Sequence, residues 1–190
     1  MALARESGTA CTPIPESPTI RKQPVVTWAE LEAAEPALAE AGRRLIHRGG
    51  EGAALLATAR GGDPPRIHPI NVGIVGGHLY TFLIGRSPKC RDLEAEGRYA
   101  LHSHVDSAEP SEFSICGRAV EVRDAVVRSR VAADWSFEVD DSYVLFELSI
   151  DSALLGIRAT ADDWPPRYTS WPLAPDRSRS GAGSPIRQTA

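Results

Sequence analysis

Residues 82–93, FLIGRSPKCRDL, contain the junction that decides the fold, because an apolar run typical of a strand leads directly into a helix start. Ser87 suits the N-cap of that helix, and Pro88 suits its first position, where the missing N–H does no harm. Lys89 then lies in the first turn, where the helix dipole disfavours positive charge. The motif therefore predicts a helix over residues 88–96, and it leaves the lysine to be explained.

Two explanations of Lys89 follow from these residues. Free backbone N–H groups and the positive end of the helix dipole attract anions, and Lys89, with Arg86 or Arg91 nearby, would add formal charge, so the junction can hold a phosphate. Alternatively, the serine and the proline only start a helix, and the basic side chains are solvated and balanced by neighbouring acidic residues. The choice between the two depends on the rest of the chain.

The composition is that of one ordinary domain. The chain has 190 residues, of which 42% are hydrophobic and 24% charged, enough to bury a core. A formal net charge of -4 gives no electrostatic reason to expect a nucleic acid or an acidic membrane surface as partner. No run approaches the roughly 20 apolar residues of a membrane span, and the N-terminus lacks a secretory signal, so we expect a cytoplasmic protein.

The two ends of the chain differ from its middle. Residues 1–23 are rich in Pro, Ser and Thr, and residues 174–190 are polar, so both are predicted to be disordered tails around one domain over residues 24–173. Thr27 followed by Glu30 is a capping-box pattern that predicts a helix, with a second helix that begins at Pro36 and ends near Gly49.

The pattern of short apolar runs and turn residues in the middle of the chain predicts an antiparallel meander. Gly76 and Gly77 separate two strand-like runs and fit a two-residue hairpin turn. A further helix is expected over residues 124–135, with Asp124 as N-cap and three valines, Val126, Val127 and Val131, as its apolar positions. Six strand-like runs predict a mainly β fold, a small antiparallel barrel with short flanking helices; they are residues 53–59, 66–75, 78–84, 98–105, 112–123 and 142–158.

Five segments of this meander carry a resemblance to a known family. They are, in order, PPRIHPIN (64–71), HLYTFLI (78–84), SPKCRDL (87–93), RYALHSH (98–104) and EFSICGRAVEVRD (112–124). Together they resemble the pyridoxamine 5'-phosphate oxidase-like split β-barrel family of flavin- or deazaflavin-dependent oxidoreductases. The resemblance covers residues 53–123 and implies a six-stranded antiparallel split barrel.

The resemblance also implies a function and a site. It implies a homodimer with FMN, or alternatively F420, at each of two clefts shared between the subunits. Thr81, Ser87 and Lys89 would hold the cofactor phosphate, and Arg66 would contribute charge nearby. The strand would pass the isoalloxazine ring; its residues are Ile67, His68, Pro69, Ile70 and Asn71. Hydride transfer to or from a small organic substrate would be the cofactor's own chemistry, so no catalytic residue is named.

Other functions stay open. True pyridoxamine 5'-phosphate oxidases carry a C-terminal segment with arginine and histidine, whereas residues 164–175, WPPRYTSWPLAP, contain Arg167 and no histidine, which puts vitamin B6 oxidation in doubt. Some split barrels bind tetrapyrroles, so a cofactor or haem carrier without turnover is an alternative, although no histidine near the C-terminus would serve as axial ligand. A dimeric binding domain with an empty cleft is a third possibility.

Several single residues have two interpretations. Pro69 cannot donate to a sheet ladder, which confines it to an edge, a bulge or a ligand-facing position. His102 and His104 share one face of a strand, but a structural role is favoured over a metal site. Cys90 follows Lys89 at a helix start, where a reactive thiol is one option and a small packing residue the favoured one. The three cysteines are expected to be reduced, and no Gly-x-Ser-x-Gly motif supports a hydrolase.

Overall fold

The computed structural model describes residues 26–160 and 162–172. Both predicted tails, and Cys11 with them, lie outside the described residues. The elements in chain order are α1 (Trp28–Ala34), α2 (Pro36–Ile46), β1 (Ala53–Thr58), β2 (Arg66–Asn71), β3 (Gly73–Val75), β4 (His78–Ile84), α3 (Pro88–Glu96), β5 (Arg98–Ser103), β6 (Glu112–Glu121), α4 (Ala125–Ala133), β7 (Tyr143–Ile157) and β8 (Arg167–Trp171). In this part of the chain, no helix is long and apolar enough to cross a membrane.

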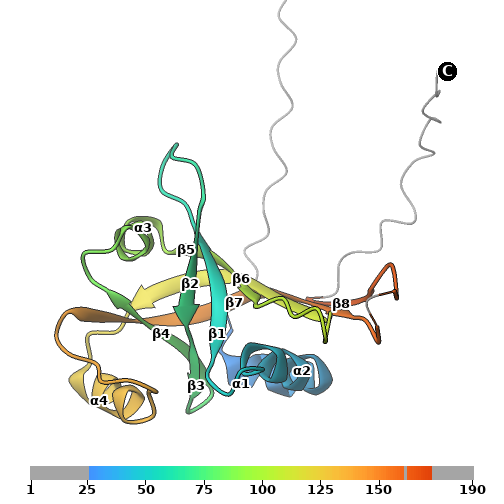
Figure 1. Ribbon diagram of the computed structural model, residues 1–190. Helices are drawn as coiled ribbons and strands as arrows, with labels where there is room; N and C mark the ends of the chain where they lie inside the picture. The colour runs from blue at the N-terminus through green and yellow to red at the C-terminus, as the bar shows by residue number, and fades with distance from the viewer. Residues whose placement is uncertain (1–25, 161, 173–190) are drawn as a thin grey trace, which may run out of the picture.

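All strand pairs are antiparallel, in the order β2-β1-β5-β6-β7-β4-β3, and β8 pairs with β7. The two end strands of this order, β2 and β3, follow one another in the chain and are separated by Val72 alone. The sheet therefore curls back on itself, as Figure 1 shows, and β2 with β3 acts as one interrupted strand. This confirms the predicted mainly β split barrel with short helices.

The interior of the curled sheet holds the main core. In β1, buried residues alternate with partly exposed ones, so one face of the strand points inward. The pair of helices α1 and α2 packs against this core: Trp28 meets Phe113 edge to face at 6.1 Å, and Gly42 leaves room for the Phe113 ring. Helix α4 instead packs beside Tyr80, Phe82 and Leu145, in a second cluster.

Local signals predicted most element boundaries. Thr27 forms the expected capping box with Glu30, which lowers the pKa of that carboxyl through hydrogen bonds to Thr27. Gly76 and Gly77 take φ of 59° and 80° in the hairpin between β3 and β4. The helix after the SPK motif, α3, has Ser87 as its N-cap and spans Pro88–Glu96, as predicted.

Three predictions were wrong. Helix α2 ends at Ile46 rather than near Gly49: His47 is its C-cap, and the His47 side chain folds back so that Nδ1 contacts the Arg43 carbonyl, which also accepts the last helical bond from the His47 N–H. Val126 is 79% exposed, because α4 packs through Val127 and Val131, four residues apart, and Val126 lies off that stripe. Six strands were expected, whereas the described sheet has eight: residues 66–75 divide into β2 and β3 at Val72, and residues 167–171 form β8, whose pairing with the distant β7 leaves no local signal.

Candidate functional site

Strand β2 has one edge without a strand partner in the described part of the chain. It pairs with β1 on its other edge and stands at the end of the strand order. The Asn71 carbonyl at the open edge accepts a hydrogen bond of 2.8 Å from the hydroxyl of the buried Thr81 on β4. Because carbonyls two residues apart point to the same edge, those of Pro69 and Ile67 face it too. Of the positions left open for Pro69, an edge, a bulge or a ligand-facing position, the structure shows the edge.

The side chains of β2 divide between two faces of the strand. Arg66 and His68 belong to the same face as the buried Ile70. Ile67 and Pro69 lie on the outer face, where Ile67 is 70% exposed. The six predicted residues of this strand therefore do not line one surface: two side chains come to the start of α3, while the others can contribute through their backbone.

Arg66 is held by carboxylates. Its guanidinium donates to Asp92 at 2.9 and 3.1 Å and to Asp63 at 3.1 Å, and these partners raise its pKa. Asp92 on α3 is 1% exposed and also accepts a 2.9 Å bond from the Thr58 hydroxyl. Burial raises the pKa of Asp92, but the hydrogen bonds from Thr58 and Arg66 outweigh it, so the pKa is lowered. The charge expected of Arg66 is thus largely balanced within the protein.

Lys89 differs from Arg66 because no ion pair of the described residues includes it. Beside it lies His68, whose Nε2 is buried and has no hydrogen-bond partner. Burial, followed by the nearby charge of Lys89, lowers the pKa of His68, so the ring is neutral at pH 7. An unpaired cation and an unsatisfied ring nitrogen thus lie together at the start of α3.

The backbone of α3 leaves few donors at that point. Pro88 has no N–H, Ser87 Oγ accepts from the Cys90 N–H at 3.3 Å, and the Ser87 carbonyl accepts from the Arg91 N–H at 3.2 Å. The backbone N–H of Lys89 takes part in neither of these bonds, so it is the donor of the first turn that is available to a ligand. Thr81 is fully buried and its hydroxyl bonds the Asn71 carbonyl, so its phosphate-binding role stays a prediction.

Cys90 is a packing residue. It is fully buried and its Sγ lies 3.4 Å from a Glu94 carboxylate oxygen. Burial and the hydrogen bond with Glu94 raise the pKa of the thiol to about 12. The reactive-thiol option is therefore wrong, because the thiolate is the nucleophile and does not form near neutral pH. Cys116 is also a free thiol.

The pair of strand histidines has no metal-binding neighbours. Among the described residues, no group of three or more His, Cys, Asp or Glu side chains could hold a metal ion. His102 Nδ1 contacts the Ser103 carbonyl at 2.6 Å, and its Nε2 lies 3.4 Å from Glu112. Its two ring nitrogens are thus engaged within the sheet.

The sequence did not predict a cleft of about 380 Å³ that begins where β2 ends. Three segments line it: the loop after α2, the turn from β2 into β3, and the end of α4; its residues are His47, Gly50, Glu51, Gly52, Asn71, Val72, Gly73, Ile74, Val75, Asp134, Trp135 and Ser136. Figure 1 shows β3 between α4 and the α1–α2 pair. The glycine-rich stretch GGEG at 49–52 was the local signal for it, but the other two walls come from distant parts of the chain.

Comparisons with known proteins agree with the fold. No family model and no curated protein matches the chain. A "Putative Pyridoxamine 5'-phosphate oxidase" from Listeria innocua is similar, with a TM-score of 0.50 and 18% identity over 60% of this chain and 94% of its own. General Stress Protein 26 from Bacillus anthracis str. Sterne has a TM-score of 0.50 and 18% identity over 68% of this chain and 95% of its own.

A third solved structure of this fold is a heme binding protein from Mycobacterium smegmatis. Its TM-score is 0.52 and its identity 15%, over 68% of this chain and 56% of the Mycobacterium chain. The structural neighbours are pyridoxamine 5'-phosphate oxidase-like split-barrel proteins, and this chain has their fold. Because the neighbours include both a presumed oxidase and a haem protein, the fold alone does not choose between the two functions.

Proposed function

We propose that this protein is a flavin-dependent oxidoreductase that binds FMN, with F420 as the alternative, along the open edge of β2. The observation that carries the proposal is the unpaired Lys89 beside the unsatisfied Nε2 of His68, at a helix start. A phosphate dianion there would neutralise the lysine and accept hydrogen bonds from its ammonium and backbone N–H. The neutral His68 can also donate to it if Nε2 carries the ring proton.

The open edge of β2 suits the ring of such a cofactor. The carbonyls of Ile67 and Pro69 face this edge, and they can accept hydrogen bonds from an N–H of a planar ring placed alongside. The bound flavin would supply the hydride chemistry. The residues of this chain would bind the phosphate, orient the ring and keep water from it.

A second copy of the chain would complete the site. Residues of five adjacent strands form a row across the outer face of the sheet: Ile67, Ala57, Ala100, Cys116 and Ser152. Ile67 at one end is 70% exposed, and Leu154 beside the other end is 38% exposed. A row of mostly small side chains with exposed apolar residues at its margins lets a second sheet approach closely. We therefore propose a homodimer, with a mass in light scattering of twice 20.5 kDa.

The experiment is a parallel titration of the purified, cofactor-stripped protein with FMN, F420 and haem, followed by fluorescence and absorption. Micromolar or tighter binding of FMN or F420, and its reduction by a nicotinamide or a reduced partner, would support the oxidoreductase. Bound cofactor without turnover would support a carrier. Binding of haem alone would replace the proposal with the function that the Mycobacterium neighbour's name states, and binding of none of the three would reject it.

A further inference from the structure

The cleft at the end of β2 shares a residue with the proposed cofactor site. Asn71 is the last residue of β2 and lines the cleft, and its carbonyl accepts a hydrogen bond from the Thr81 hydroxyl. A compound held there would lie next to whatever occupies the open edge of β2. The cleft has a volume of about 380 Å³, which is at the lower end of the range of small-molecule sites.

The walls of the cleft depend on close packing. A Cβ atom on Gly73 would lie 2.7 Å from the Trp135 ring, so the missing side chain lets the indole approach the β3 backbone. Trp135 also meets Phe82 edge to face, with ring centroids 5.0 Å apart. The indole is therefore held by packing and gives the cleft an aromatic wall, suited to the face or edge of a small ring.

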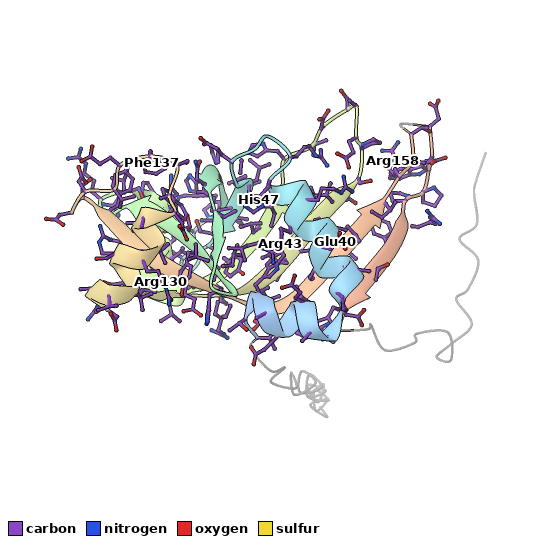
Figure 2. All side chains as sticks on the ribbon, turned by 90° about the horizontal axis from the view of Figure 1, so that it is seen from below. Glu40, Arg43, His47, Arg130, Phe137 and Arg158 are labelled. Carbon is purple, nitrogen blue, oxygen red and sulfur yellow. The ribbon has the colours of Figure 1, made fainter. Side chains whose placement is uncertain are left out.

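The polar lining of the cleft includes hydrogen-bond acceptors beside the Trp135 indole N–H, a buried donor that has no hydrogen-bond partner in the described structure. His47 Nδ1 lies 2.9 Å from the Arg43 carbonyl, which can only accept, so Nδ1 carries a proton. When the ring holds that proton alone, Nε2 is an acceptor, and it lies 3.2 Å from where a Cβ on Gly52 would stand, at the cleft wall. Figure 2 shows His47 at the C-terminal end of α2, one turn beyond Arg43.

Two carboxylates add negative charge to this lining. Glu51 and Asp134 both line the cleft and have no ion pair among the described residues, and no lysine or arginine belongs to the described lining. Asp134 is also the C-cap of α4, so the negative end of the helix dipole points the same way. The cleft thus offers acceptors and negative charge beside an aromatic wall.

From these features we infer that the cleft binds a small ring compound that carries an ammonium or similar cationic donor. The ring lies against Trp135, the charge lies between Glu51 and Asp134, and a further donor of the ligand reaches His47 Nε2. That this ligand class includes the substrate rests on the proposed function, whereas the binding of such a ligand to the cleft does not.

The test compares benzylammonium with benzyl alcohol and benzoate, three probes with the same ring and different charge, by calorimetry on the full chain. Benzylammonium is expected to bind at least tenfold more tightly than the other two. Glu51→Gln and Asp134→Asn should each weaken it threefold or more and change benzyl alcohol less than twofold. Glu40→Gln, an equal charge change on the exposed side of α2, is the control and should have no effect.

The same titration on the FMN-loaded protein separates the two proposals. A change in the visible flavin spectrum on adding benzylammonium, lost in Asp134→Asn while FMN affinity is kept, supports a substrate pocket beside the cofactor. If benzylammonium binds but FMN does not, the cleft assignment stands and the oxidoreductase falls. The inference about the cleft is wrong if FMN binds and benzylammonium binds no more tightly than benzyl alcohol and benzoate. It is also wrong if Glu40→Gln weakens benzylammonium binding as much as Asp134→Asn does.

Discussion

The start of α3 and the cleft at the end of β2 are built in opposite ways. At α3, one continuous motif supplies the cap, the proline and the lysine, and a single strand supplies the neighbouring Arg66 and His68. In the cleft, the walls come from residues about 25 and 60 positions apart along the chain, and backbone contacts hold two of them together. Ligand binding at the start of α3 therefore depends on the charge of one side chain, whereas the shape of the cleft depends on the close approach of main chains.

The largest expected effect is that of Gly52→Ala on the stability of the fold. A Cβ atom at this position would lie 1.9 Å from the Val72 carbonyl oxygen, and Gly52 also accepts the Val72 N–H at 3.0 Å. Relief of the clash must separate β1 from the β2–β3 turn, so we expect a loss of about 3 kcal/mol in the free energy of unfolding, measured with urea.

Gly49→Ala is the matched control for this substitution. Nothing lies within 4 Å of a Cβ at Gly49, so its stability should stay within about 0.5 kcal/mol of the parent protein. Equal stability of the two variants would show that the loop moves freely against the turn between β2 and β3, and the cleft would then lack a fixed wall.

This contrast also explains what the sequence alone could predict. Caps, the Gly76–Gly77 hairpin and the helix after Ser87 rest on contacts between near neighbours, so their signals lie within a few residues. Strand β8, the partners of Arg66 and the Trp135 wall depend on pairings between distant segments. The strand that begins at Arg66 was predicted correctly, but the ion pair between Arg66 and Asp92 depends on the fold, and the role of Arg66 near a phosphate stays a prediction.

A second prediction concerns the acid stability that the Asp92 cluster provides. The pKa of Asp92 lies below its ordinary value of 3.8, so its ionised form stabilises the fold above about pH 4, and this contribution is lost as the pH falls through the lowered pKa. Asp92→Asn should cost about 2 kcal/mol at pH 7, less than for a fully buried pair because Arg66 is a third exposed.

Urea unfolding of Asp92→Asn and the parent between pH 3 and pH 7 measures this effect. The difference between the two should shrink toward pH 3. Asp63→Asn, whose carboxylate is 47% exposed, is the control and should change stability by less than about 1 kcal/mol. A difference that stays constant with pH would mean that the ionised carboxylate of Asp92 does not contribute.

The third prediction tests the start of α3 directly. Lys89→Ala should weaken FMN binding at least tenfold, consistent with the loss of a charge-assisted hydrogen bond of about 1.5–3 kcal/mol, and should leave the free energy of unfolding nearly unchanged. Arg44→Ala removes the same charge from α2 and should not affect binding. Fluorescence titration measures both; equal FMN affinity in Lys89→Ala and the parent protein would exclude a phosphate at this site.

The smallest expected effect separates the two roles that Ser87 can have. As the N-cap of α3, its Oγ accepts from the Cys90 N–H, so Ser87→Ala should cost about 1 kcal/mol of stability and Ser87→Gly only a few tenths. The hydroxyl proton is still free to reach a phosphate, and a neutral bond of that kind is worth about 0.5–1.5 kcal/mol. Both variants should therefore lose FMN affinity equally and by less than Lys89→Ala, because Ala and Gly alike remove the hydroxyl. If affinity instead follows stability, and falls only in Ser87→Ala, the serine acts on the cofactor solely through the helix start, and Lys89 with His68 supplies the side-chain recognition of the phosphate.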